Sequence, residues 1–135
     1  IELDLDGRVV VVDLKTGRSK PSDPAVKAHV QLALYQYAVD HGALDPPGED
    51  GPPVRAGGAE LVQLGLPDGK DGATVQQQPA HDEDGPEREE LRLRLAHAAG
   101  LVRDETFPAI PGQHCRSCTF VPLCPAKSSG SVVAQ

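Results

Sequence analysis

The sequence has 135 residues, which is enough for one domain with a single hydrophobic core. Only 3% of the residues are aromatic and none is Trp, so Val, Leu and Ala must build that core. The sequence contains no run of about 18 apolar residues and no signal peptide. These features exclude a membrane-spanning helix, and we expect a cytoplasmic protein with no membrane partner.

The net charge of −7 disfavours strong binding to nucleic acid by the isolated chain. Most of the acids lie in the middle, where residues 41–105 carry fourteen acids against six bases. Residues 1–40 are nearly balanced, and residues 106–135 carry two bases and no acid. The excess acids therefore read as a solvated face. The chain begins without Met and inside what reads as a strand, so we expect a piece of a longer protein.

A β-hairpin is predicted at the start of the chain. Residues 1–5 and the apolar run from Val9 to Val12 read as two strands joined by Asp6-Gly7. The run of four valines has the composition of a strand that is buried on both faces.

Two charged residues, Asp13 and Lys15, follow the valine run. They are two positions apart, so on a strand both side chains leave the same face, about 7 Å apart. Burying an acid and a base at this place costs several kcal/mol unless a partner or a metal compensates.

A helix is predicted for residues 25–39. Its apolar positions follow helical spacing, and Gln31 and Tyr35, four residues apart, share a different face. The rest of the sequence predicts a loop at 43–58, two strands at 59–66 and 73–78 joined by a turn at 67–72, and a charged helix at 87–102. The buried stripe of that helix is expected at Leu91, Leu95 and Ala98 or Ala99. The last residues, 127–135, read as a disordered tail.

All three cysteines lie near the C-terminus in the spacing C-x2-C-x5-C, as Cys115, Cys118 and Cys124. This spacing suits an iron–sulfur cluster or a zinc site. A cubane cluster needs four ligands, and His114 is badly placed to be the fourth because it adjoins Cys115. Disulfides are less favoured, because the number of cysteines is odd and nothing marks the chain as secreted.

Two of these motifs together resemble the PD-(D/E)xK nuclease superfamily, and more narrowly the RecB-type nuclease domain of bacterial helicase–nucleases. The resemblance rests on VVDLKTG, residues 11–17, followed at the right distance by QLALY, residues 31–35. It implies a restriction-endonuclease-like α/β core, in which helices flank a mixed central sheet. A cysteine-rich metal-binding segment follows this core.

The resemblance also assigns roles in phosphodiester hydrolysis. Asp13 and the main-chain carbonyl of Leu14 would hold Mg²⁺ or Mn²⁺, and Lys15 would face the scissile phosphate or the attacking water. Gln31 and Tyr35 would orient the lysine, a water molecule or the DNA. The family's upstream acidic ligand and its more distant histidine would lie before Ile1, and we expect Glu2 and Asp4 to be solvated rather than ligands.

The cysteine spacing points to one branch, the AddB- and AdnB-like subunits, and the AdnB type fits best. In that branch an upstream cysteine joins three near the C-terminus, which implies a 4Fe-4S cluster on Cys115, Cys118 and Cys124. The chain would then hold a partial nuclease core in residues 1–105 and an iron–sulfur segment in residues 106–126.

The implied activity is that of a metal-dependent exonuclease within an ATP-dependent helicase–nuclease. Such an enzyme resects DNA ends for recombinational repair. Its partners would be DNA, a helicase motor domain in the same parent chain and a second helicase–nuclease subunit.

Two alternatives stay open. A non-catalytic domain could keep the fold and a structural cysteine-bound metal only to grip DNA or a partner, although intact Asp13 and Lys15 argue against it. A small zinc-binding module with an incidental D-x-K does not account for the helix with Gln31 and Tyr35.

Overall fold

The computed structural model describes residues 1–45, 52–66 and 72–126. By internal packing the chain divides into two units, Ile1–Arg94 and Leu95–Gln135, and each is described by itself. The tail expected at 127–135 and nearly all of the turn expected at 67–72 lie outside the described residues. No helix in these described ranges is long and apolar enough to cross a membrane.

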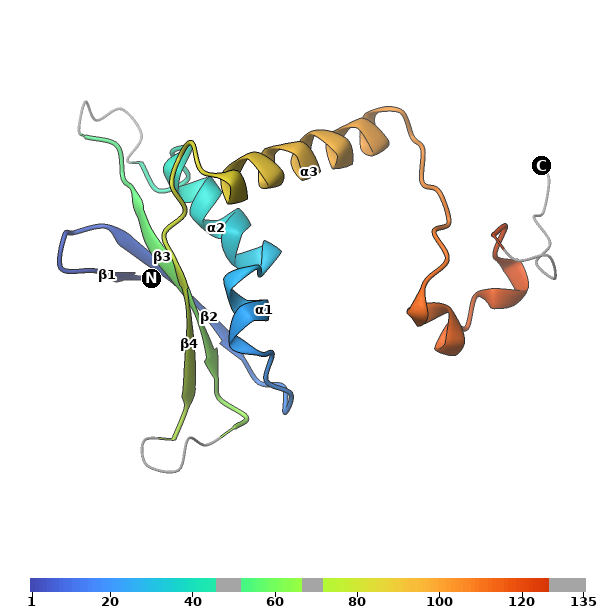
Figure 1. Cartoon of the computed structure of the whole chain (residues 1–135), viewed down its shortest axis with the longest axis horizontal. Coiled ribbons are helices and arrows are strands. Elements are labelled where there is room, and N and C mark those ends of the chain that lie inside the picture. The colour runs from blue at the N-terminus through green and yellow to red at the C-terminus, as the bar shows by residue number, and fades with distance from the viewer. Residues whose placement is uncertain (46–51, 67–71, 127–135) are drawn as a thin grey trace. The chain divides into compact units, whose positions relative to one another are not determined.

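A four-stranded sheet forms the centre of the first unit (Figure 1). The strands follow one another across the sheet in chain order, as β1 (Glu2–Leu3), β2 (Val9–Lys15), β3 (Ala56–Gln63) and β4 (Thr74–Pro79). The central pair, β2 and β3, is parallel, whereas both outer pairs are antiparallel. The expected mixed sheet with flanking helices is thus present, and it is compatible with a restriction-endonuclease-like α/β fold.

The hairpin expected at the start forms between β1 and β2. Gly7 has a φ of 75°, a conformation that glycine adopts without a steric penalty. Asp4 Oδ1 accepts hydrogen bonds from the main-chain N–H groups of Asp6 and Arg8, at 2.9 and 2.8 Å. This carboxylate therefore closes the turn.

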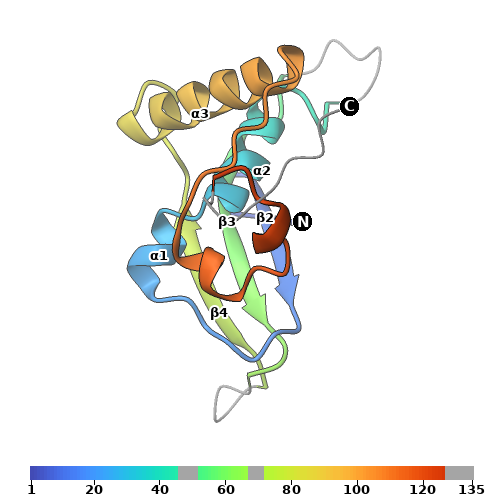
Figure 2. The same cartoon turned by 90° about the vertical axis from the view of Figure 1, so that its right-hand side faces the viewer.

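The prediction that the valine run is buried on both faces was wrong. Val9 is buried, but the next three valines are only half-buried, and Leu14 is 60% exposed. The reason is that α1 and α2 lie on the same side of the sheet (Figure 2). Two core clusters form, one of Val26, Leu32, Ala59 and Leu61, and the other of Val9, Val39 and Ala56.

The single helix expected at 25–39 is divided into α1 (Asp23–Lys27) and α2 (Val30–Asp40). The buried amide of Gln78, on β4, lies at the break. Its Nε2 is 3.1, 3.0 and 3.1 Å from the main-chain oxygens of Val26, Lys27 and His29, respectively. The carbonyls of Val26 and His29 also accept main-chain hydrogen bonds, from His29 N and Ala33 N. The Gln78 amide therefore bridges the end of α1 and the start of α2, and it supplies a donor to the Lys27 carbonyl at the break.

Helix α3 (Pro86–Arg103) closely matches the helix expected at 87–102. Of its expected buried stripe, Leu91 is buried and Leu95 is half-buried, but Ala98 and Ala99 are exposed, so the prediction for these two alanines was wrong. Within the first unit, the start of α3 is fastened by Arg88, which is only 2% exposed. The pairing of Arg88 with Asp40 was not predicted from the sequence.

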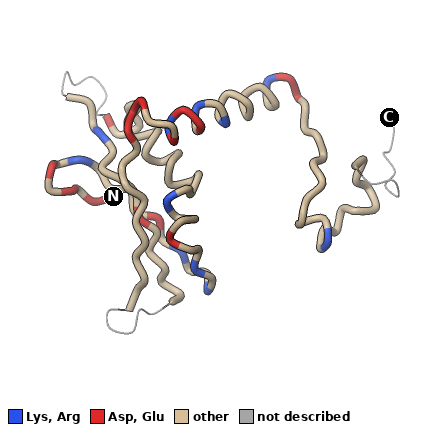
Figure 3. The backbone as a smooth tube through the Cα atoms, viewed as in Figure 1, with Lys and Arg blue, Asp and Glu red and all other residues tan. Residues whose placement is uncertain are grey.

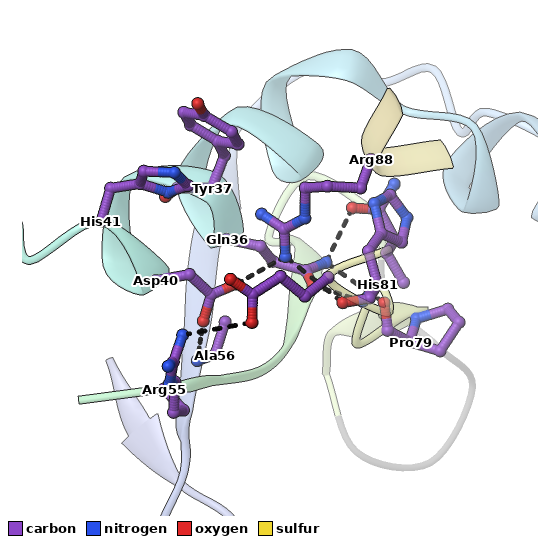
Figure 4. Close-up of polar contacts among 11 residues, drawn as sticks. Gln36, Tyr37, Asp40, His41, Arg55, Ala56, Pro79, His81 and Arg88 are labelled. Carbon is purple, nitrogen blue, oxygen red and sulfur yellow. Dashed lines mark hydrogen bonds and ion pairs between the residues drawn. The ribbon is translucent and has the colours of Figure 1, made fainter. Parts of the chain in front are cut away.

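Arg88 pairs with Asp40 at the end of α2, and its Nη2 also lies 3.3 Å from the carbonyl oxygen of His81 (Figure 4). Asp40 in turn accepts a hydrogen bond from the main-chain N–H of Ala56, at 2.8 Å. This buried ion pair joins α2, α3 and the start of β3. A buried pair of this kind needs such additional hydrogen bonds to offset desolvation.

In the second unit, beyond the end of α3, two short 3₁₀ turns form, Gln113–Ser117 and Val121–Leu123. They carry or flank the three cysteines.

Candidate active site

The C-terminal end of β2 carries the two charged residues that the sequence singled out. The side chain of Asp13 is 14% exposed and that of Lys15 is half-buried, and Asp13 Oδ2 lies 2.8 Å from Lys15 Nζ. Both side chains leave the same face of β2, as their spacing predicts. An ion pair thus stands at the end of a strand in the middle of the sheet.

Helix α2 brings the other two expected residues to this pair. Lys15 Nζ donates to Gln31 Oε1 at 3.0 Å, and Gln31 Nε2 donates to Tyr35 Oη at 2.6 Å. The structure therefore places all four residues in one continuous array, in the order Asp13, Lys15, Gln31, Tyr35. The array runs from the sheet to the helix that covers it.

The buried oxygen of Asp13, Oδ2, has the Lys15 ammonium as its cationic neighbour, at 2.8 Å, and has no aligned hydrogen bond from another described residue. Burying a carboxylate is costly unless a cation compensates, as the ammonium does here. Carboxylate oxygens are also the ligands that Mg²⁺ prefers.

The main-chain carbonyl of Leu14 could be a second oxygen ligand. Lys15 O accepts a hydrogen bond from Leu64 N beyond the end of β3, at 2.8 Å, so it points toward β3. Successive carbonyls of a strand point to opposite edges, so that of Leu14 points away from β3. On that side β1 pairs only with Val9 and Val10.

These two oxygens fit the chemistry of Mg²⁺ or Mn²⁺ but not the full number of ligands. Mg²⁺ prefers six oxygens. Within residues 1–45, 52–66 and 72–126, no group of three or more His, Cys, Asp or Glu side chains could hold a metal. Asp13 and Leu14 would therefore supply part of a coordination sphere.

Neither nearby acid completes this set. Glu2 is exposed on β1. The carboxylate of Asp4 accepts hydrogen bonds within the hairpin turn. The one from the main-chain N–H of Arg8 holds the pKa of Asp4 below its ordinary value.

A polar residue that the sequence analysis missed, Gln63, lies next to Lys15 on the neighbouring strand. The two are register partners at the ends of β2 and β3. Strand alternation could have revealed it, because Gln63 is two residues after the buried Leu61 and so shares its face.

The three cysteines lie together in the second unit but do not form a metal site. Together with His114 they line one hollow of about 460 Å³, and all three are free thiols. The sulfur of Cys115 accepts a hydrogen bond from Gly112 N at 3.3 Å. Since the described residues contain no group of ligands that could hold a metal, the structure does not support the expected 4Fe-4S cluster.

Comparison with protein families matches residues 1–125 to the PD-(D/E)XK nuclease superfamily. A comparison with curated proteins found no match. Members of the superfamily are generally metal-dependent nucleases, and they typically use Mg²⁺ or Mn²⁺. The family match spans nearly the whole sequence, and the chain therefore belongs to the PD-(D/E)XK nuclease superfamily.

Proposed function

We propose that this chain is the nuclease part of a divalent-metal-dependent deoxyribonuclease of the RecB type. The observation that carries the proposal is the continuous array from Asp13 through Lys15 and Gln31 to Tyr35. An incidental ion pair at a strand end would not require a glutamine and a tyrosine, one helical turn apart, to extend it.

Each residue of the array has a role in phosphodiester hydrolysis. Asp13 and the Leu14 carbonyl would hold Mg²⁺ or Mn²⁺, which, when bound, polarises a phosphate oxygen and lowers the pKa of water. Lys15 would offer a fixed positive charge to the phosphate as negative charge develops on it. Gln31 holds the ammonium group in place, and Tyr35 fixes the orientation of the Gln31 amide.

The C-x2-C-x5-C spacing supports a narrower proposal, that of an AdnB- or AddB-like subunit of an ATP-dependent helicase–nuclease. The chain would contribute a partial nuclease core, residues 1–105, and a cysteine-rich segment, residues 106–126. It would act as an exonuclease in the resection of broken DNA ends. A helicase motor would lie in the same parent chain, and a second helicase–nuclease subunit would complete a heterodimer.

In this proposal the missing ligands come from upstream of Ile1. An acidic residue would complete the metal site, and a fourth cysteine would complete a 4Fe-4S cluster with Cys115, Cys118 and Cys124. The coding sequence before Ile1 tests this. It should encode G-x-x-D-R immediately before Ile1, an earlier cysteine and a Walker A motif, and their absence would refute the narrower assignment.

Metal content tests the cluster separately. Anaerobic iron and sulfide analysis of the complete gene product should find a cluster that Cys118→Ala removes. One zinc and no iron would replace the cluster by a zinc site.

The incomplete metal site favours one alternative, a non-catalytic domain that binds DNA or a partner. Cleavage of a labelled oligonucleotide by the complete gene product, with Mn²⁺ and then with EDTA, separates the two functions. Lys15→Ala should lose the metal-dependent cleavage, and Lys27→Ala, an exposed lysine on α1, should retain it. DNA binding without any metal-dependent cleavage would establish the alternative instead.

A further inference from the structure

A hollow of about 410 Å³ lies next to the candidate active site, at the ends of the parallel strands β2 and β3. The last residues of these strands, Lys15 and Gln63, both line it. In open α/β sheets, ligands bind outside the carboxyl ends of parallel strands. The other lining residues come from the loop after β2, from β3 and from the junction of α1 and α2. They are Gly17, Ser19, Lys20, Pro21, His29 and Leu61.

Gln63 is the most unusual residue of this lining. It is 2% exposed, and its Oε1 is buried without a hydrogen-bond partner among the described residues. Buried side-chain amides almost always have partners, because an unsatisfied one is costly. Turning the amide by half a rotation exchanges Oε1 and Nε2, so the group can present either an acceptor or a donor.

The charges around the hollow favour an anionic ligand. Among the described residues, Lys20 and Lys15, whose charge Asp13 partly offsets, line the hollow and no carboxylate does, although the chain has seven more acids than bases. By contrast, three other hollows of the first unit each contain at least one acid. The loop after β2 also carries Arg18, and it is one of the basic stretches in Figure 3.

The loop that borders the hollow passes close to the segment after β3. A Cβ on Gly65 would lie 2.7 Å from Thr16 O and 2.8 Å from Gly17 O. Only glycine allows the two backbones to approach so closely. His29, which also lines the hollow, adds a buried Nδ1 that has no hydrogen-bond partner in the described part of the chain.

We propose that this hollow is a phosphate subsite for DNA, next to the phosphate that Lys15 would face. Gln63 donates its amide N–H to a phosphate oxygen, and Lys20 supplies the charge. The inference rests on the proposed nuclease function for the identity of the ligand as DNA. A backbone phosphodiester and a terminal 5′-phosphate share the same chemistry, so the experiment must separate these two sources.

The test is the affinity of the 135-residue chain for a 3′-labelled single-stranded oligonucleotide, measured by fluorescence anisotropy in EDTA. Gln63→Leu should weaken binding about tenfold, because a hydrogen bond to a charged phosphate is lost. Lys20→Ala should reduce the slope of log K against log[salt] by about 0.7. The matched controls are Gln77→Leu and Lys27→Ala, both exposed and outside the hollow, and they should bind as the parent does.

Oligonucleotides with 5′-hydroxyl and 5′-phosphate ends identify the source of the phosphate. An equal loss with both substrates assigns a backbone phosphate, whereas a loss confined to the 5′-phosphate substrate assigns a terminal one. A shift of the Gln63 side-chain amide resonance on adding DNA provides a second reading that does not depend on the fold of a variant. The resonance is identified by its disappearance in Gln63→Leu.

Two results would overturn the subsite: parental affinity for DNA in both Gln63→Leu and Lys20→Ala, or no shift of the Gln63 amide resonance when the protein is saturated with DNA. So would the absence of binding at about 1 mM DNA, above the usual range of non-specific dissociation constants. The measurement needs no metal, so its failure is distinct from failure of the nuclease proposal. If cleavage depends on Asp13 but binding does not depend on Gln63, only the subsite is refuted; the reverse result refutes only the nuclease function.

Discussion

Lys15 Nζ donates to Gln31 Oε1 at 3.0 Å, and this one contact joins the end of β2 to α2. It also determines how the glutamine is oriented. Because Oε1 accepts from an ammonium group, Nε2 is left to donate, and it donates to Tyr35 Oη. The order of donors and acceptors along the array is therefore fixed by the lysine.

The tyrosine hydroxyl should matter to catalysis through this orientation. Tyr35→Phe removes the acceptor of Gln31 Nε2, and one neutral hydrogen bond contributes about 1 kcal/mol. We expect kcat/KM for metal-dependent cleavage by the complete gene product to fall about fivefold, with the fold intact. Tyr37→Phe is the matched control, because Tyr37 stacks on His41 outside the array. Equal rates for both variants and the parent would show that Tyr35 has no part in the site.

The break between α1 and α2 should depend on Gln78. Gln78→Leu leaves the carbonyl of Lys27 without its donor, whereas the carbonyls of Val26 and His29 keep their main-chain donors. A buried group that loses its partner costs about 1–3 kcal/mol, so we expect the free energy of unfolding, measured in urea, to fall by about 1–3 kcal/mol. Gln77→Leu, the exposed neighbour, should change stability by less than about 0.5 kcal/mol. A Gln78→Leu protein as stable as this control would mean that α1 and α2 separate for another reason.

Stability should also respond to acid through His81. Burial lowers the pKa of His81 below 6.5, the positive charge of Arg88 lowers it further, and Glu87 partly opposes both. Below pH 6.5 the unfolded chain therefore binds a proton that the folded chain does not. The stability due to neutral His81 is complete above pH 6.5 and is lost as pH falls toward the folded-state pKa.

Urea unfolding at pH 7.5 and pH 5.5 measures this effect. His81→Gln should lose less stability between the two pH values than the parent, because it removes the proton uptake by the unfolded chain. His97→Gln, which removes an exposed histidine of α3, should keep the parental difference. An unchanged pH dependence in His81→Gln would contradict the assignment.

The residues of the array could be identified from the sequence because their spacing is local. Two positions on a strand and four on a helix place Asp13 with Lys15, and Gln31 with Tyr35, on common faces. The mixed sheet followed from the order of strand and helix patterns. A hairpin and a strand–helix–strand connection predict antiparallel and parallel pairs, respectively.

The rest depended on contacts between distant parts of the sequence. Gln78 divides a helix about fifty residues earlier in the chain, and Arg88 pairs with Asp40 across 48 residues. A glutamine on a strand and an arginine in a charged helix give no local sign of such partners. Gln63 was overlooked for a related reason, since its importance depends on which strand lies next to β2.

Replacement of Asp13 by Asn in the complete gene product tests the central claim most directly. The substitution keeps the shape of the side chain and removes the charge that would hold the metal. The initial rate of Mn²⁺-dependent DNA cleavage should fall at least about 100-fold, as expected when a charged group of the catalytic site is lost. Asp84→Asn, which removes an equal but exposed charge, should cleave at the parental rate. Cleavage by folded Asp13→Asn at the parental rate, with the metal present, would contradict the assignment of this site.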